Sequence, residues 1–381
     1  MRLRSPAFRR RSSSGRSWSA YLPSPSSAAA PSAAHGAASS PPTSSSSRTT
    51  ATSPPSPLVS GFQHGGSMYQ DILALNRRAT DPAAQLIPIN RLDDASLIPH
   101  ASCDGLLILS IQCFYFSICN PVTREEAPLD LVCGFTFLGF YPHRPTGEYR
   151  LLLYRGAKLM FEDLIPGPRD AYYVYALGSG LPRRIGSPSS SERPLIGCAP
   201  VLFRGCLHWN PGQHKSGRGV IAVFNTETES FQLMRAPTLG NRNYGFGVYT
   251  LFEMDGTLGM FSCNDGDLQC IDIWVLQDYE KEVWKLRYQV ELPMSEIMHK
   301  FDASLRWRAM AVYEEGSIVV LVHGDRWLLH VDTEGKLQAS FHRDGQSLMP
   351  SSEMIKQSLV RHAFFPKLND YEVNDCIGPL I

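Results

Sequence analysis

The sequence predicts an all-β protein made of repeated four-stranded antiparallel units, preceded by a disordered N-terminal segment. From about Leu58 onward, short runs rich in Val, Ile, Leu, Phe and Tyr are separated by Gly, Pro, Asn and Asp at intervals of about 8 to 12 residues, which is typical of short strands joined by turns. A glycine turn recurs along this part of the chain. The residues before Leu58 have a different composition, without the apolar content of a core.

Residues 1–57 are predicted to form a disordered leader, and residues 58–381 the β-rich domain. The leader holds seven Arg, no Lys, Asp or Glu, and 37 Ser, Pro and Ala residues. Such a segment buries too little apolar surface to offset its chain entropy. Its composition also resembles an organelle transit peptide, but repeated prolines interrupt every helical window after about the first twenty residues, so we favour a leader without a targeting role.

The overall charge gives no reason to expect binding to nucleic acid or to an anionic membrane. The chain has 36 basic and 36 acidic residues, and because seven Arg lie in the leader, the rest carries a net charge of −7. No apolar run approaches the roughly 18 residues of a membrane-spanning helix. The nine Cys are odd in number and form no Cys-x-x-Cys pair, which predicts free thiols and a cytoplasmic or nuclear location.

Four copies of one repeat can be read in the body. Each begins with a turn in which Gly follows a charged residue, continues through an apolar strand, and reaches a polar turn after a further strand. The glycines of these copies are Gly105, Gly205, Gly256 and Gly316, and the polar turns span residues 120–124, 225–229, 277–280 and 332–335. A fifth copy is expected in residues 149–154 and 171–185, with its turn at Gly178-Ser179-Gly180.

A four-stranded unit that repeats about every 50 to 60 residues resembles a blade of a kelch-type propeller, in which sheets stack on their neighbours around a central channel. We therefore expect a propeller-like array of blades, with the apolar strands facing adjacent blades. The aromatic residue after each polar turn is expected to pack over its hairpin. Residues 295–302 and 352–361 are the best candidates for short helices.

Two motifs near the start of the body are specific: residues 100–107 are HASCDGLL, and residues 118–124 are ICNPVTR. They are similar to the "CDGLL … NPxTR" signature that opens the F-box-associated domain of plant F-box proteins. Gly205-Cys206-Leu207-His208-Trp209, residues 223–231 and residues 273–279 continue the resemblance toward the C-terminus. The resemblance implies a β-propeller or related module that captures protein substrates. In that family an F-box of about 40 residues precedes the domain and docks on the Skp adaptor of an SCF-type ubiquitin ligase.

The leader does not resemble an F-box. It contains only Leu3 and Leu22 among Leu, Ile and Val, whereas adaptor docking needs Leu- and Ile-rich helices. The chain as given is therefore expected not to bind the adaptor directly. Two alternatives to a ligase subunit remain: a binding protein or decoy unconnected to any ligase, and a propeller enzyme acting on sugars.

The sequence offers no catalytic, cofactor-binding or metal-binding residues, so no cofactor is expected. Nucleophile elbow, phosphate-loop and zinc-helix motifs are absent, and Gly245-Phe246-Gly247 lacks the third glycine of a dinucleotide fingerprint. Residues 264–267 (NDGD) have the wrong spacing for a calcium loop and are interpreted as a β-turn. The histidine pairs His208 with His214 and His323 with His330 lack acidic or Cys neighbours at useful offsets. His208 is expected to lie in a blade core, hydrogen-bonded to a neighbouring strand.

The predicted partner is an unidentified protein, bound through loops between strands. Three segments that mix aromatic, Arg and Asn residues are the candidates: 141–148, 210–219 and 235–245. No individual site residue is singled out.

Overall fold

A computed structural model provides the structure of the chain. It describes residues 56–63, 70–75, 86–92, 97–111, 115–129, 132, 134–156, 168–188, 199–213, 219–238, 247–264, 267–301, 307–314, 316–324, 326–343, 346–356 and 358–369. The predicted leader lies outside the described residues apart from its last two positions. The first described strand begins at Ser56.

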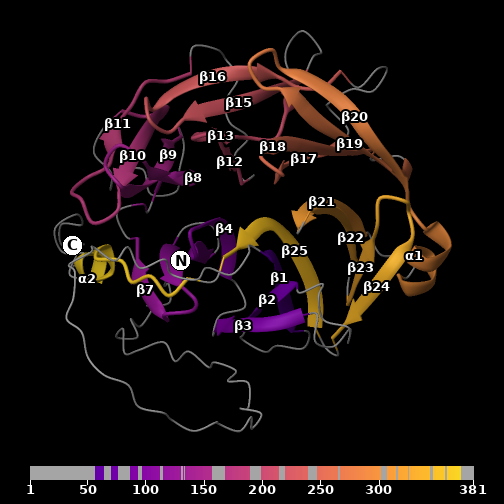
Figure 1. The fold of residues 1–381 in the computed structure, drawn as a ribbon. Helices are drawn as coiled ribbons and strands as arrows, with labels where there is room; N and C mark the ends of the chain where they lie inside the picture. The colour runs from indigo at the N-terminus through magenta and orange to yellow at the C-terminus, as the bar shows by residue number, and fades with distance from the viewer. Residues whose placement is uncertain are drawn as a thin grey trace, which may run out of the picture.

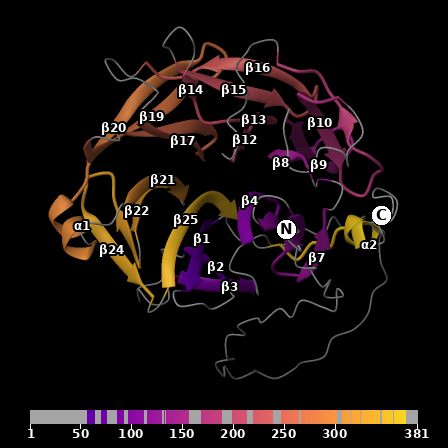
Figure 2. The same cartoon turned by 180° about the vertical axis from the view of Figure 1, so that it is seen from behind.

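The described strands form six antiparallel sheets arranged around a common centre, seen from one side in Figure 1 and from behind in Figure 2. The predicted all-β propeller is therefore confirmed, and it has six blades. Blade 1 comprises β25 (Gln346–Ile355), β1 (Ser56–Gln63), β2 (Gln70–Leu75) and β3 (Leu86–Leu92). Blade 2 comprises β4 (Leu97–Cys103), β5 (Leu106–Ile111), β6 (Tyr115–Asn120) and β7 (Glu125–Pro128). Blade 3 comprises β8 (Thr136–His143), β9 (Glu148–Arg155), β10 (Ala171–Ala176) and β11 (Arg183–Arg184).

The second half of the ring repeats this arrangement. Blade 4 comprises β12 (Val201–Phe203), β13 (Cys206–His208), β15 (Gly219–Asn225) and β16 (Ser230–Arg235), with the short β14 (Gly212–Gln213) also paired to β15. Blade 5 comprises β17 (Gly247–Met254), β18 (Thr257–Asn264), β19 (Asp267–Asp278) and β20 (Val283–Glu291). Blade 6 comprises β21 (Arg308–Glu314), β22 (Ser317–Gly324), β23 (Trp327–Val331) and β24 (Leu337–His342). Within each blade, the strand nearest the centre comes first in this order (Figure 1).

The ring is closed by pairing between the two ends of the chain. β25 pairs antiparallel with β1, so that Ser56 lies opposite Ile355 and Gln63 opposite Gln346. Beside this pairing, the buried Asp71 of β2 accepts a 3.0 Å hydrogen bond from the side chain of Gln346. Blade 1 therefore combines three strands from the start of the described chain with one from its end.

The hydrophobic core lies between blades rather than within them. One buried cluster joins blades 2 and 3, a second joins blades 3 and 4, a third joins blades 4 and 5, a fourth joins blades 1 and 2, and the largest joins blades 5, 6 and 1. Trp209, fully buried, lies in the cluster of blades 3 and 4 and donates a 3.2 Å hydrogen bond to the carbonyl of Leu138 in blade 3. Each apolar strand thus stacks on the next blade, as the repeat predicts.

The glycine turns join the first and second strands of their blades. In blade 2, Asp104 and Gly105 have φ values of 51° and 88°, the backbone of a tight type I′ hairpin, and Asp255 with Gly256 repeats it in blade 5. The corresponding turn of blade 3 is residues 144–147, which ends at Gly147 with φ 71°. The turn at Gly147 is longer than the others and has Thr146, rather than a charged residue, directly before its glycine, so it does not show the repeated pattern. The fifth copy expected in residues 149–154 and 171–185 is confirmed as β9, β10 and β11 of blade 3, and its Gly178-Ser179-Gly180 turn joins β10 to β11.

The polar turns join the third and fourth strands of their blades. In four blades an Asn or Asp begins the turn and its Oδ1 accepts hydrogen bonds from backbone N–H groups that follow, as in an Asx-turn; these residues are Asn120, Asn225, Asp278 and Asp332. In blade 4, the aromatic residue after the polar turn contacts the neighbouring blade as well as its own hairpin. Phe231 lies 4.9 Å from the ring of Phe224 in its own hairpin and 4.8 Å from Tyr172 of blade 3.

Two short helices occur among the described residues. The predicted helix at residues 295–302 is confirmed, with its bounds shifted, as α1 (Met294–Lys300). The predicted helix at residues 352–361 is wrong, because residues up to Ile355 belong to β25. Pairing with β1 supplies that segment with ladder hydrogen bonds, so tertiary context overrides its local helical pattern.

After β25 the chain crosses the end of blade 2 at which the glycine and polar turns lie, which we call the turn end of the propeller. The buried side chain of Asn120 donates hydrogen bonds of 3.1 Å to the carbonyls of Ser358 and Val360. The helix α2 (Phe364–Asn369) then contacts β7, and Phe365 is buried in the cluster of blades 2 and 3. The last described residues are thereby fixed to the turn end.

Candidate recognition surface on blade 3

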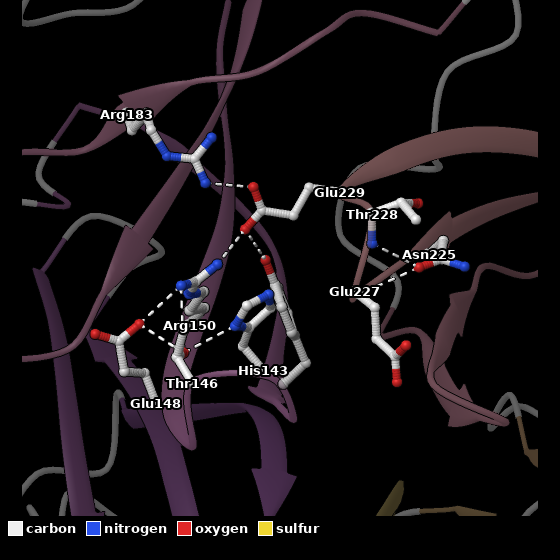
Figure 3. Close-up of polar contacts among 10 residues, drawn as sticks. His143, Thr146, Glu148, Arg150, Arg183, Asn225, Glu227, Thr228 and Glu229 are labelled. Carbon is white, nitrogen blue, oxygen red and sulfur yellow. Dashed lines mark hydrogen bonds and ion pairs between the residues drawn. The ribbon is translucent and has the colours of Figure 1, made fainter.

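A carboxylate from blade 4 is held by three side chains of blade 3. Glu229 ends the turn between β15 and β16, and Figure 3 shows its two oxygens facing blade 3. Arg150 of β9 donates a 2.6 Å hydrogen bond to Oε1, Arg183 of β11 forms an ion pair with Oε2, and the Tyr141 hydroxyl lies 3.4 Å from Oε1. The Glu229 side chain is 10% exposed. This cluster therefore ties the polar turn of blade 4 to three strands of blade 3.

The turn that joins β8 and β9 continues this network. Thr146 donates a 2.8 Å hydrogen bond to Glu148, which also receives a 2.7 Å hydrogen bond from Arg150 (Figure 3). The ring Nδ1 of His143 lies 2.8 Å from the Thr146 hydroxyl. Because these contacts are all within blade 3, they fix the shape of the turn and orient Arg150 toward Glu229.

The charges in the cluster stabilise one another. Burial alone would raise the pKa of Glu229, but hydrogen bonds and charge from Arg183 and Arg150 hold that pKa below its ordinary value. Hydrogen bonds from Arg150 and Thr146 likewise lower the pKa of Glu148. Burial, with the nearby Glu229 carboxylate, raises the pKa of Tyr141. At neutral pH the cluster is therefore two guanidinium and two carboxylate groups with a neutral phenol, an arrangement that fixes structure and offers no activated nucleophile.

Residues 181–184, which lead into and form β11, are the accessible part of this surface. Leu181 is 66% exposed, Arg184 is exposed, and the side chain of Arg183 is 57% exposed despite its ion pair with Glu229. We call Leu181, Pro182, Arg183 and Arg184 the β11 corner. Residues 171–185 were expected only as part of a blade; the Arg183-Arg184 pair two residues after the Gly-rich turn was the signal that could have identified the corner.

The three segments predicted to bind a partner lie at different ends of the propeller. Residues 141–148 belong to β8, its turn and the start of β9, at the turn end. Residues 210–219 connect β13 with β15, and residues 235–245 connect β16 with β17, both at the opposite end. Residues 214–218 and 239–245 of these segments lie outside the described residues. The described residues of the first segment therefore lie at the end opposite to the described residues of the other two segments.

His208 and residues 264–267 were considered as possible ligand-binding residues and interpreted as structural. His208 is fully buried, its Nδ1 lies 3.3 Å from the carbonyl of Val201 on the neighbouring strand, and its Nε2 lies 2.9 Å from the Tyr279 hydroxyl of blade 5. Burial lowers the pKa of His208 to about 4. Residues 264–267 join the paired strands β18 and β19, with Asn264 opposite Asp267, as in a hairpin turn. His214 lies outside the described residues.

Other features concern the described part of the chain as a whole. Within it, no group of three or more His, Cys, Asp or Glu residues is placed to hold a metal ion. No helix within it is long and apolar enough to cross a membrane. The cysteines that the structure describes are free thiols, as predicted: Cys103, Cys119, Cys206, Cys263 and Cys270.

A closed six-bladed ring with its hydrophobic core between the blades defines a propeller-type domain. Comparison with protein families then assigns it: residues 82–335, well over half of the chain, match the F-box associated β-propeller domain. The chain belongs to this family. The resemblance read from residues 100–124 is thus confirmed.

Curated relatives agree with the family match. The chain is 25% identical over 279 residues to the F-box protein At5g10340 of Arabidopsis thaliana, covering 65% of this chain and 58% of that protein. It is 26% identical over 173 residues to the F-box protein At5g65850 of Arabidopsis thaliana, covering 44% and 41% of the two chains. The match therefore spans about half the length of these relatives.

Solved structures also include distant propeller-like neighbours. A gluconolactonase from Xanthomonas campestris aligns over 78% of this chain and 90% of its own, with 9% identity and a TM-score of 0.36. A likeness this distant carries no argument about activity.

Proposed function

We propose that this chain is the protein-recognition module of an F-box protein and that it presents a bound partner to an SCF-type ubiquitin ligase. The observation that carries the proposal is the family match over residues 82–335, together with relatives that are F-box proteins. A propeller suits this role because its rigid ring supports exposed edges and loops for partner binding. The proposed role requires no catalytic activity of the domain itself.

The geometry of the chain ends is compatible with simultaneous binding of an adaptor and a partner. β1 begins at Ser56, opposite Ile355, at the turn end of blade 1. A segment that precedes residue 56 therefore joins the propeller there, two blades away from the β11 corner. An adaptor held by such a segment leaves the outer edge of blade 3 accessible.

The test is a binding titration of two proteins against the purified Skp adaptor. The first is the chain as given, and the second carries a family-type F-box before Leu58. Because residues 1–57 hold only Leu3 and Leu22 among aliphatic anchors, we expect no useful affinity for the first and tight one-to-one binding for the second. Tight binding by the chain as given would show that the leader has been misinterpreted.

The ligase role is tested separately by comparing ubiquitin-modified peptides in cells that express either protein. Proteins that gain ubiquitin only with the F-box fusion, and that crosslink to the propeller in both cases, would support the proposal. If crosslinked proteins never gain ubiquitin with the fusion, the module is a binding protein or decoy outside any ligase, and the proposal is wrong.

A further inference from the structure

Blade 3 is the basic blade of an otherwise acidic body. Its described residues, 134–156 and 168–188, hold six Arg against two acidic residues, Glu148 and Asp170. Blade 5 has the opposite balance, with eight acidic and three basic residues in 247–264 and 267–291. Because the domain outside the leader is net negative, this local excess of Arg makes blade 3 the part of the ring that attracts an acidic partner.

The β11 corner combines this charge with exposed apolar surface. Leu181, 66% exposed, lies two residues before Arg183. Arg183 forms an ion pair with Glu229, and Glu229 is shared with Arg150. Arg184 follows as an exposed neighbour. Arg is enriched at protein interfaces, and the exposed Leu181 adds apolar surface that a bound partner can cover.

The backbone of β11 also has a free edge. Ile185 N–H donates a 2.9 Å hydrogen bond to the Tyr172 carbonyl, and Arg183 lies opposite Val174 of β10. In an antiparallel strand, the backbone N–H and C=O groups of every second residue point to the same neighbouring strand. Because those of Arg183 and Ile185 point to β10, the N–H and C=O of Arg184 point away from it. β11 is the outermost strand of its sheet, so these groups face the rim of the propeller.

We propose that the β11 corner is a docking site for an extended peptide segment, within a protein partner, that alternates acidic and apolar residues. The segment pairs as an added strand with the free edge at Arg184. On one face of the added strand a carboxylate pairs with Arg184, whose planar guanidinium group suits bidentate contact, and on the opposite face an apolar residue covers Leu181. This inference rests on the proposed function, because it names the class of partner that the module recognises.

The chemistry favours a peptide over a nucleic acid. Glu148 and Glu229 lie within the same cluster of blade 3, and these carboxylates would repel a continuous phosphate backbone. A peptide places a single carboxylate at Arg184 and avoids the acidic positions. The open strand edge likewise matches a peptide backbone in hydrogen-bonding spacing.

The test measures fluorescence anisotropy of a labelled 12-residue peptide that alternates Glu with Val, titrated with the full chain. We expect saturable binding that weakens as salt rises, and no binding of a counterpart in which Lys replaces each Glu. Arg184→Glu should weaken binding at least tenfold, and Leu181→Ser should weaken it severalfold. Lys285→Glu, an equal charge reversal at an exposed position of the outer strand β20, should leave binding unchanged.

Other results would overturn the proposal. The first is an equal loss of peptide binding in Lys285→Glu and Arg184→Glu. The second is tighter binding of a 12-nucleotide single-stranded RNA, or of phosphatidylserine vesicles, than of the Glu peptide. The third is tighter binding of a synthetic peptide of residues 370–381 than of the Glu peptide. The last result would make the corner an internal contact of this chain. Melting curves of each variant verify that the ring stays folded.

The experiments distinguish a failure of the docking-site proposal from a failure of the proposed ligase role. The peptide titration uses the isolated chain and needs no ligase. If Arg184→Glu leaves crosslinked partners and their ubiquitination unchanged, the docking site is wrong while the ligase role stands. If the peptide binds as expected and no partner gains ubiquitin, the docking site stands and the ligase role is wrong.

Discussion

The side-chain amide of Asn120 lies 3.1 Å from the backbone carbonyl of Ser358, a residue 238 positions later in the chain. The same nitrogen donates to the carbonyl of Val360, while Oδ1 accepts from Val122 N–H at 3.0 Å within its own turn. Asn120 is fully buried. One side chain therefore shapes a hairpin of blade 2 and also fixes the segment that follows the closing strand.

We predict that Asn120→Asp destabilises the fold by about 3 kcal/mol, because it keeps the turn acceptor and places a buried charge against two carbonyl oxygens. Asn225→Asp is the matched control. Asn225 occupies the same turn position in blade 4, and blades 5 and 6 already use Asp278 and Asp332 there. Denaturant unfolding should give the control an unfolding free energy within about 0.5 kcal/mol of the parent chain. Equal losses of unfolding free energy in both variants would contradict a stabilising hydrogen bond from Asn120 to the Ser358 carbonyl.

Glu229→Gln is predicted to lower the free energy of unfolding by about 1 to 3 kcal/mol at pH 7, since Arg150 and Arg183 lose their shared carboxylate. Glu148→Gln is the control, because the Glu148 side chain is 44% exposed and its ion pair with Arg150 is solvated. Its effect should stay below about 1 kcal/mol. A larger loss in Glu148→Gln than in Glu229→Gln would contradict the role of Glu229 as the carboxylate that joins blades 3 and 4.

The Glu229 contribution should depend on pH. Its pKa is lowered in the folded chain, so its stabilising effect is fully present above the ordinary carboxyl pKa of about 4.3 and is lost as pH falls through the lowered folded value. The difference in unfolding free energy between the parent chain and Glu229→Gln should therefore shrink from pH 5 downward. Unfolding titrations in acid provide the measurement; a difference that stays constant down to pH 2 would contradict it.

Gly105→Ala is predicted to destabilise the chain more than Gly256→Ala. Both glycines hold the same hairpin position with positive φ, 88° and 74°, so both substitutions incur the backbone strain of about 1 kcal/mol. A Cβ on Gly105 would overlap Cβ of Ser358 and lie 2.8 Å from the Lys356 carbonyl, whereas Gly256 has open space. Melting temperatures should rank the parent chain above Gly256→Ala and Gly256→Ala above Gly105→Ala; equal losses would mean that residues 356–358 do not cover this turn.

Limited proteolysis should remove residues 1–57 and leave a resistant fragment of about 35 kDa. The expectation follows from the Ser-, Pro- and Ala-rich composition of those residues, because cleavage concentrates in segments without a core. Mass spectrometry of the fragment locates the new N-terminus. A leader as resistant as the rest of the chain would contradict the predicted boundary.

The repeat was readable from the sequence wherever its turns use local chemistry. An acidic residue before Gly105 or Gly256 encodes a tight hairpin within two residues, and Asn120 or Asn225 encodes an Asx-turn within four. The turn at Gly147 escaped detection because it is longer and has Thr146, rather than a charged residue, directly before its glycine. Residues 352–355 were mistaken for a helix because their strand partner, β1, lies about 300 residues earlier in the chain.

The sequence by itself determined the all-β class, the propeller-like repeat and the family, because turns and alternating strands depend on neighbouring residues. Only the tertiary structure decided the number of blades, the closure of the ring by β25 and β1, and the contact of Arg183 with Glu229. These depend on groups brought together from distant positions by burial between blades. The same packing leaves Leu181 and Arg184 exposed at the rim, a property that local composition cannot encode.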